Sequence, residues 1–429
     1  MSNSRKFILI TVDDLKRDRT SLEQERETTP FLEKFAGDNF YQDNHFSNGT
    51  VSPTSFRSIL TSSYPHEYDD RDYLNEDRPY LPQILSESNV EAEGLSTNPF
   101  VSEYYGFEKG YDEFLDATLE SSHEESGLDK LKQGAKDLVK KTPFSSRLRV
   151  LRDRFRGRGT PYMEGEEVLS NAEKLLENDN SDEDTFYWCH FMDTHSPFVP
   201  PEETRGTWSE FGSRREVWKN LEKEEPEQLL ELYDECMLYL DRNLEKLVKI
   251  LEEKFEDQEY EIIITSDHGE LFYDDEWGAY GHPNMLKEEL FEVPLFTTFE
   301  SGRDFSTHVD ILPTVLDFFD VKVPESVRGL SLLSEDSKEF DFVETDSNGN
   351  EWLEQKWRDK RAAKISKNGI VEIVNITRDE EPEDEDLKEH LERIGEKEGS
   401  SEDESDLSKE EEEKVKENLR QLGYDEKVK

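Results

Sequence analysis

Long apolar runs and cysteine are both scarce in this chain of 429 residues, of which 33% are hydrophobic. The clearest apolar runs span six to eight residues, whereas a membrane-spanning helix needs roughly 20. Residues 1–6 are polar and lead straight into such a run, so we expect no signal peptide and no membrane span, and we predict a cytoplasmic protein. Two cysteines, Cys189 and Cys236, are too few for a disulfide framework or a zinc–thiolate site.

Basic residues are also few, at 53 against 104 acidic ones, and the formal net charge is −51. Residues 379–429 carry −13 of this, which leaves −38 on the rest of the chain. A field of this sign repels nucleic acid and anionic membranes, so neither is an expected partner. Such a high negative charge suits a protein in molar salt, where the Debye length falls to about 3 Å and the repulsion between its own charges is screened. We therefore predict a halophilic source; the alternative is an acidic cytosolic protein with a disordered end.

The apolar residues that remain are grouped in a way that predicts the fold class. Continuous runs suit strands buried on both faces of a sheet, and they are Phe7–Val12, Thr185–Phe191, Glu261–Thr265 and Val293–Thr298. Gly165–Leu176 and Glu225–Phe255 carry apolar residues at helical spacing. Alternation of the two patterns predicts an α/β fold, with a mostly parallel central sheet and helices on both sides.

The composition divides the chain into three parts. We expect a catalytic domain over residues 1–338, with 121–158 as an insertion or lid, and a small C-terminal subdomain over 339–378. In that subdomain Phe340–Val343 and Ile370–Ile376 read as strands and Glu351–Lys367 as partly helical. Residues 379–429 form an acidic, partly disordered tail, in which Leu387–Ile394 is expected to be an exposed helix.

Acidic and histidine residues follow three of the predicted strands. In open α/β sheets, ligands bind outside the carboxyl ends of the strands. Any one of these residues alone could simply cap a helix, but several carboxylates at one edge repel each other unless a cation neutralises them. Oxygen ligands with an imidazole suit one divalent ion, and Ca, Mg, Mn and Zn all stay open. The residues concerned are Asp13, Asp14, Asp193, His195, Asp267 and His268.

Ser52 begins a second element, because Ser52-Pro53 opens a segment with helical spacing. Serine followed by proline is a usual helix start, so Ser52 as an N-cap is one interpretation. In the other, a hydroxyl at a helix N-terminus, next to a metal ion, acts as a nucleophile on an anionic ester. Arg57, on the same helix, would then neutralise oxygens of the substrate.

Taken in order, these segments resemble the sulfatase branch of the alkaline phosphatase superfamily. Six matching segments occur in the family's order over roughly residues 5–335, and they are Phe7–Leu15, Ser52–Pro65, Gly106–Phe114, Asp193–Phe198, Ser266–Glu270 with Gly281-His282 and Val293–Leu295, and His308–Leu332.

The resemblance implies an alkaline-phosphatase-like three-layer sandwich and a hydrolase of sulfate-type esters. One divalent cation would be held by Asp13, Asp14, Asp267 and His268, with Ser52 as the nucleophile or as the precursor of formylglycine. His195 or His282 would protonate the leaving alcohol, and His190 and His66 are assigned to structure. The expected substrate is a small-molecule, glycan or lipid ester, and the oligomeric state stays open.

Three departures from the family pattern keep other reactions open. The modification pattern C/S-x-P/A-x-R meets Thr54 and Phe56 at its third and fifth positions, which predicts an unmodified Ser52. A Lys-x-His pair is missing near residues 95–100, where Asn98 is the nearest polar residue. His268 stands where many sulfatases have Asn, and in this it resembles phosphonate-ester hydrolases and phosphoglycerol transferases. The alternatives are therefore a phosphate or phosphonate ester hydrolase, a phosphoglycerol-type transferase, and an inactive binding protein.

Overall fold

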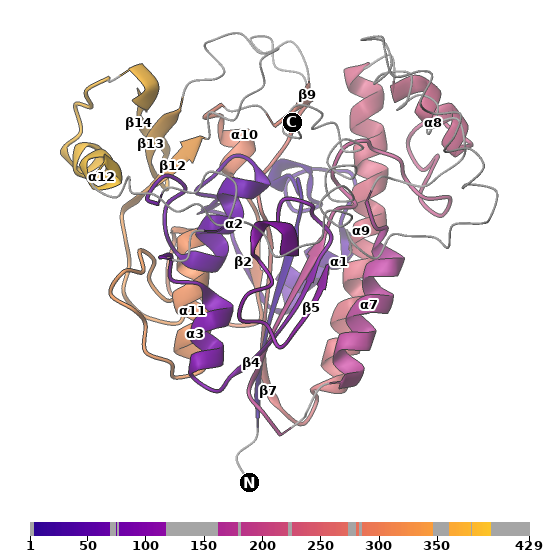
Figure 1. Cartoon of the computed structure of the whole chain (residues 1–429). Helices are drawn as coiled ribbons and strands as arrows, with labels where there is room; N and C mark the ends of the chain where they lie inside the picture. The colour runs from indigo at the N-terminus through magenta and orange to yellow at the C-terminus, as the bar shows by residue number, and fades with distance from the viewer. Residues whose placement is uncertain are drawn as a thin grey trace, which may run out of the picture.

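A seven-stranded sheet runs through the computed structural model, and helices pack on both of its faces (Figure 1). The strand order is β2-β10-β7-β1-β6-β4-β5. The strands are β2 (Phe40–Gln42), β10 (Leu295–Thr297), β7 (Glu259–Ser266), β1 (Arg5–Val12), β6 (Thr185–Phe191), β4 (Glu91–Ser96) and β5 (Glu113–Asp116). The structure describes residues 4–68, 74, 77–116, 162–178, 182–221, 225–272, 280–282, 285–345, 360–378 and 380–395.

Parallel pairing dominates this sheet, as the continuous apolar runs predict. β1 lies between β6 and β7 and is parallel to both, and β4 is parallel to β6 and β5. The Val293–Thr298 run does form a strand, β10, but β10 is antiparallel to both β7 and β2. An apolar run identifies a buried strand without indicating its direction, and one antiparallel strand agrees with the prediction of a mostly parallel sheet.

The two faces of β1 explain the three layers. Ile8 and Ile10 pack in the core under α1 (Pro30–Asp38), α7 (Gly165–Asn178) and α9 (Pro226–Lys254). Phe7 and Leu9 point to the opposite core, under α2 (Ser52–Thr61), α3 (Leu81–Glu87) and α11 (Ile311–Phe318). Successive strand residues alternate between faces, so a strand that is apolar throughout needs cover on both sides. The α/β three-layer prediction is confirmed.

A small antiparallel sheet follows the main one, at the upper left of Figure 1. It consists of β12 (Phe340–Thr345), β13 (Arg361–Ser366) and β14 (Gly369–Asn375). The expected strands at 340–343 and 370–376 are confirmed, but the expectation of partial helix over 351–367 is wrong for Arg361–Ser366, which pairs with strands on both sides. α12 (Glu385–Gly395) confirms the helix expected at 387–394, and its Leu387 is buried against β12 and β14 rather than exposed.

Shorter elements connect these layers. They are β3 (His45–Phe46), β11 (Ser306–Thr307), β8 (Leu271–Phe272), β9 (Tyr280–Gly281), α8 (Arg214–Leu221), α10 (Glu288–Phe291), η1 (Arg17–Arg19), η2 (Glu103–Tyr105), η3 (His308–Asp310) and η5 (Ile376–Arg378). Cys189 and Cys236 are both buried free thiols. Among the described residues, no helix combines the length and apolar character needed to cross a membrane. The expected insertion at 121–158 lies outside the described residues.

Candidate active site

Neighbouring parallel strands end together and deliver the first residues of the site. In the register of the sheet, Val12 lies opposite both Phe191 and Ser266. The Asp13 N–H donates to the Phe191 carbonyl over 2.8 Å, and the Asp267 N–H donates to the Val12 carbonyl over 3.0 Å. The two aspartates that follow β1 and β7 are therefore held side by side by backbone hydrogen bonds, as the sequence predicts for one sheet edge.

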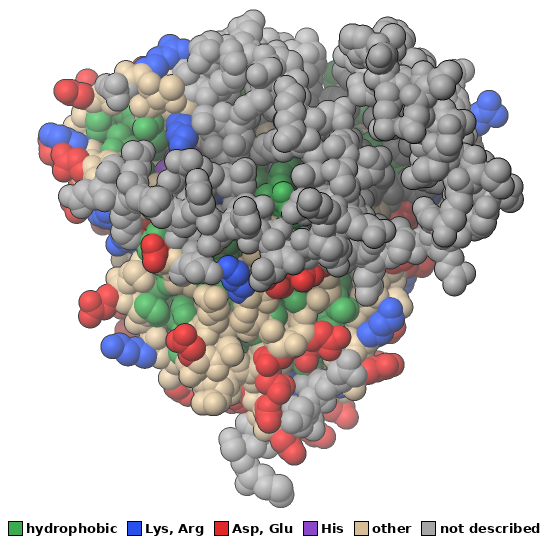
Figure 2. Space-filling view, viewed as in Figure 1, with side chains coloured by type: hydrophobic (Ala, Val, Ile, Leu, Met, Phe, Trp, Pro, Cys, Tyr) green, Lys and Arg blue, Asp and Glu red, His purple; other side chains and the backbone are tan. Residues whose placement is uncertain are grey.

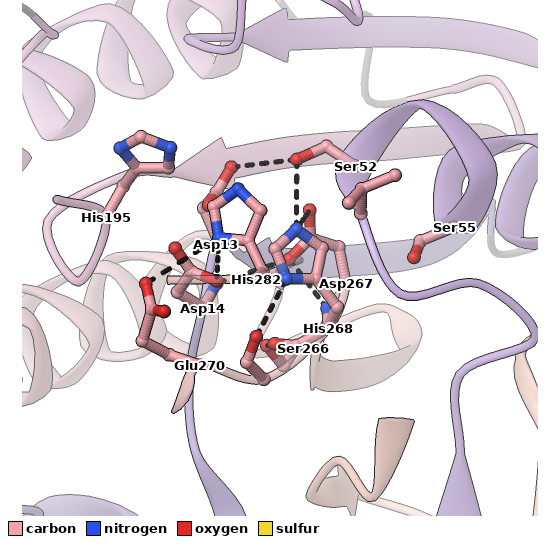
Figure 3. Close-up of polar contacts among 12 residues, drawn as sticks. Asp13, Asp14, Ser52, Ser55, His195, Ser266, Asp267, His268, Glu270 and His282 are labelled. Atoms are coloured by element: carbon pink, nitrogen blue, oxygen red, sulfur yellow. Dashed lines mark hydrogen bonds and ion pairs between the residues drawn. The ribbon is translucent and has the colours of Figure 1, made fainter. Parts of the chain in front are cut away.

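Ser52 points its hydroxyl into this edge from the first turn of α2 (Figure 3). Its Oγ donates to Asp13 Oδ2 over 3.2 Å and lies 3.3 Å from His268 Nε2. Asn98 Nδ2 donates to Ser52 Oγ over 3.0 Å and to Asp13 Oδ2 over 2.7 Å. Ser52 is 5% exposed. The hydroxyl thus lies among a carboxylate, an amide and an imidazole, which follow the strands β1, β4 and β7.

The N-cap interpretation of Ser52 is wrong. The N-cap of α2 is Val51, whose backbone carbonyl accepts hydrogen bonds from the N–H groups of Thr54 and Ser55, each over 3.0 Å. Ser52 is the first helical residue and Pro53 the second, so the serine side chain makes no cap hydrogen bond. The serine is left available for the site beside it.

Asp13, Asp267 and His268 have the chemistry of a cation site. His268 Nε2 lies 3.5 Å from Asp267 Oδ2, and all three residues are 0% exposed. The described part of the chain offers no hydrogen-bond donor to Asp13 Oδ1 or to Asp267 Oδ2. Buried charged oxygens without partners are costly unless a cation pairs with them, so these residues fit a divalent metal ion.

The electrostatics of the same three residues point the same way. Burial and then the neighbouring Asp13 carboxylate raise the pKa of Asp267 to about 6. Burial alone would lower the pKa of His268, but the carboxylates of Asp267 and Asp14 outweigh it and raise that pKa to about 9. Without a metal ion the site therefore holds excess negative charge and draws in a proton; a bound divalent cation would displace that proton.

Asp14 contacts the other nitrogen of the same imidazole. His268 Nδ1 donates to the Gly269 carbonyl over 3.0 Å and lies 2.9 Å from Asp14 Oδ1. A proton on Nδ1 leaves the Nε2 lone pair directed at Ser52 and at the space between the carboxylates. Asp13, Asp14 and His268 also lie close enough together to hold an ion. That Asp14 binds the same cation as Asp13 stays a prediction.

His195 and His282 lie on the Asp14 side of the site (Figure 3). His282 Nδ1 is 3.3 Å from Asp14 Oδ1 and 3.6 Å from Glu270 Oε2, and the rings of His195 and His282 are 5.7 Å apart. Sequence reasoning gave Glu270 no role. The available signal was its place three residues after Asp267, in the segment that follows the buried strand β7.

The structure places His190, which the sequence assigned to a structural role, beside the proposed metal ligands. His190 Nε2 lies 3.6 Å from Asp13 Oδ2, and Asp13, His190 and Asp267 are close enough to hold an ion. Its Nδ1 is 2.9 Å from Thr11 Oγ1, its partner in the sheet register. His66 instead donates through Nε2 to the Thr345 carbonyl over 2.6 Å, which agrees with a structural role.

Two further residues complete the comparison with the sequence. The sequence singled out Asn98 only as the polar residue nearest to the missing Lys-x-His pair. In the structure its side chain is hydrogen-bonded to Ser52. Arg57 lies in α2 and is buried, at 8% exposed; its action on substrate oxygens stays a prediction.

Comparisons with known proteins address the same segments. A family model described as Sulfatase matches residues 5–321. N-acetylglucosamine-6-O-sulfatase of Bacteroides thetaiotaomicron is 23% identical over 378 residues, covering 71% of this chain and 65% of that protein. The chain thus spans just under two thirds of the length of this relative.

Two solved structures share the fold. One is a protein in complex with its substrate D-glucosamine-2-N,6-O-disulfate, with a TM-score of 0.59, 16% identity and coverage of 97% of this chain and 99% of that one. The other is the phosphonate monoester hydrolase of Silicibacter pomeroyi, with a TM-score of 0.58, 15% identity and coverage of 92% and 94%.

Proposed function

This chain belongs to the sulfatase family, and on that premise we propose that it hydrolyses a sulfate-type ester through the Ser52 hydroxyl. One divalent cation would be held by Asp13, Asp267 and His268, with Ser52 completing the set. Asp14 faces the far nitrogen of His268, so we assign it to holding that ring in place. The substrate class is a small-molecule, glycan or lipid ester.

A single observation carries this proposal: the Ser52 hydroxyl is hydrogen-bonded to Asp13 instead of capping its helix. A cation bound there would lower the pKa of the hydroxyl and neutralise charge that develops on the transferred group. All the predicted ligands are present and close together, which argues against an inactive binding protein.

The proposed chemistry assigns each bond to a residue. Ser52 Oγ gives its proton to the Asp13 carboxylate, to which it is hydrogen-bonded, and forms a bond to sulfur as the bond from sulfur to the ester oxygen breaks. Asn98 holds Oγ in line, and Arg57 with the first N–H groups of α2 would stabilise the equatorial oxygens. His195 or His282 protonates the departing alcohol, a role worth roughly 10²–10⁴ in rate. Water then cleaves the Oγ–S bond and restores Ser52.

A phosphate or phosphonate ester is the second candidate, and two features favour it. His268 takes the place of the Asn of many sulfatases, and Thr54 and Phe56 break the pattern that marks a serine for conversion to formylglycine. An unmodified serine favours direct attack at phosphorus. The same covalent intermediate could pass its group to an acceptor alcohol instead of water, which would make the protein a transferase.

The mass of the Ser52 peptide, measured together with a substrate panel, distinguishes these candidates. We expect unmodified serine, and turnover of at least one of aryl sulfate, aryl phosphate and phosphonate monoester in the presence of a divalent metal. A peptide lighter by two hydrogens would reveal formylglycine and support the sulfate reaction. Turnover of none of the three classes with Mg, Ca, Mn or Zn would contradict the proposal.

We also propose that the protein works in high salt. Asp and Glu side chains are dispersed over the described surface in Figure 2, and −38 of the net charge precedes residue 379. Raising KCl from low to molar concentration should increase the melting temperature, since each kcal/mol of relieved repulsion is worth about 2 °C. A melting temperature indifferent to KCl would contradict this.

The matched control for the salt prediction is a chain truncated after Gly395. Residues 396–429 carry only −6 of the −51, so the truncated chain should show nearly the same salt dependence. Truncation at 379 is unsuitable because α12 would be lost. Its Leu387 is buried in the core of the small sheet, and His390 Nε2 lies 2.7 Å from Glu344 Oε1.

A further inference from the structure

A second group of metal-binding side chains lies beside the proposed first site, on the far side of the His268 ring from Ser52. It consists of Asp14, His195 and His282, whose ligand atoms all lie within 4.8 Å of one another. Glu270 adds a carboxylate oxygen 3.6 Å from His282 Nδ1. Asp14, His195 and Glu270 lie in the segments that follow β1, β6 and β7, and His282 directly follows β9. All four side chains are drawn in Figure 3.

Both carboxylates of this group have a buried oxygen without a hydrogen-bond partner among the described residues. Asp14 and Glu270 are both 0% exposed. Within the described ranges, no hydrogen-bond donor reaches Asp14 Oδ2 or Glu270 Oε2. The ammonium group of Lys16 donates to the backbone carbonyl of Glu270 over 2.7 Å and pairs with Asp18. Two buried carboxylate oxygens thus lie beside histidine rings without accepting a hydrogen bond, an arrangement that a bound cation would stabilise.

The imidazoles are oriented as ligands. His195 Nδ1 lies 2.5 Å from the carbonyl oxygen of Ser196, which can only accept, so Nδ1 carries the proton and Nε2 keeps its lone pair. Metal-bound histidines usually have this arrangement, with the second ring nitrogen bonded to a backbone carbonyl. Two imidazoles with carboxylate oxygens suit Zn²⁺ or Mn²⁺ better than Ca²⁺ or Mg²⁺, which prefer oxygen alone.

We infer that Asp14, His195, His282 and Glu270 form a second divalent-cation site, separate from the one at Asp13, Asp267 and His268. This inference rests on the proposed function, in which Asp13, Asp267 and His268 bind a cation of their own. Two cations beside one nucleophile suit displacement at a group with more than one negative charge. The second site therefore favours a phosphate-type ester. In the two-cation form His195 and His282 would be ligands, and the cation that they hold would stabilise the departing oxygen in place of the proton that one of them gives in the one-cation form.

Metal content per chain tests this site without relying on activity. Metal-free full-length protein is dialysed against Zn²⁺ or Mn²⁺ and measured by elemental mass spectrometry, with binding followed by calorimetry. We expect two ions in the wild type, one in His282→Ala and one in Asp267→Asn. His66→Gln, outside both groups, is the matched control and should keep two. Circular dichroism and a melting curve check the fold, and Glu270→Gln, which is nearly isosteric, gives a second variant that should weaken only one of the two binding events.

The outcomes separate the second site from the proposed function. One ion in both the wild type and His282→Ala would overturn the second site while leaving the first intact. Two ions in folded His282→Ala and in Glu270→Gln, with affinities unchanged, would also overturn it. Failure of the proposed function looks different, because Asp267→Asn would then keep every ion and full turnover.

Discussion

Replacing Ser52 with alanine is expected to abolish turnover, by about 10³-fold or more, while the protein stays folded and keeps its metal. The hydroxyl forms the covalent bond in the proposed reaction, whereas Asp13, Asp267 and His268 remain to hold the cation. Ser52 makes no cap hydrogen bond in α2, so the free energy of unfolding should fall by only about 1 kcal/mol, for the lost contacts to Asp13 and Asn98.

Ser55 offers a matched control on the same helix. It is buried like Ser52, but its Oγ lies 3.0 Å from Ser47 Oγ, and the residue lies apart from the group around Ser52 in Figure 3. Ser55→Ala should therefore lose a similar amount of stability and keep its turnover. Rate, metal content and melting temperature measured on one preparation of each variant decide the matter. Appreciable turnover in Ser52→Ala would exclude the serine as nucleophile.

Asp267→Asn should remove the metal and the activity together. The substitution keeps the shape of the side chain. It also keeps one oxygen that can accept the hydrogen bond from the backbone N–H of His268, which donates to Asp267 Oδ1 over 2.8 Å. It removes the negative charge opposite Asp13, so metal affinity should fall by at least about 10–100-fold. Burial and Asp13 raise the pKa of Asp267 in the metal-free protein, so losing this charge should not destabilise the metal-free fold.

Asp184→Asn is the control for the lost carboxylate. Asp184 lies just before β6, at the opposite end of the sheet, where it pairs with Arg5 over 2.8 Å. This variant should bind metal and turn over substrate like the wild type. Full turnover by wild-type protein stripped of metal would show that the carboxylate cluster serves another purpose.

The main strands and the site edge could be predicted because burial leaves a direct mark on the sequence. A strand covered on both faces must be apolar throughout, and polar residues such as Asp13 and Asp267 stand out where it ends. Strand direction leaves no such mark, so the antiparallel direction of β10 could not be predicted from its apolar run. β13 was missed because Arg361–Ser366 is a strand only through its pairing with β12 and β14.

Side-chain roles were harder to predict because they depend on contacts between distant segments. His190 sits within an apolar run and reads as a core residue, and only the pairing of β6 with β1 reveals its approach to Asp13. Asn98 and Glu270 have no motif of their own. Their importance follows from distances to Ser52 and His282, which depend on loops whose paths the sequence does not state.

The central claim is that Ser52 carries the transferred group, and a quenched reaction tests it most directly. Metal-loaded protein is mixed with excess aryl sulfate, aryl phosphate or phosphonate monoester, stopped in acid within the first turnover, and digested for peptide mass spectrometry. We expect the peptide that contains Ser52 to gain the mass of the sulfo, phospho or phosphono group, in wild type and in Ser55→Ala. Single-turnover product formation with no adduct on Ser52, or with the adduct on another residue, would contradict the account.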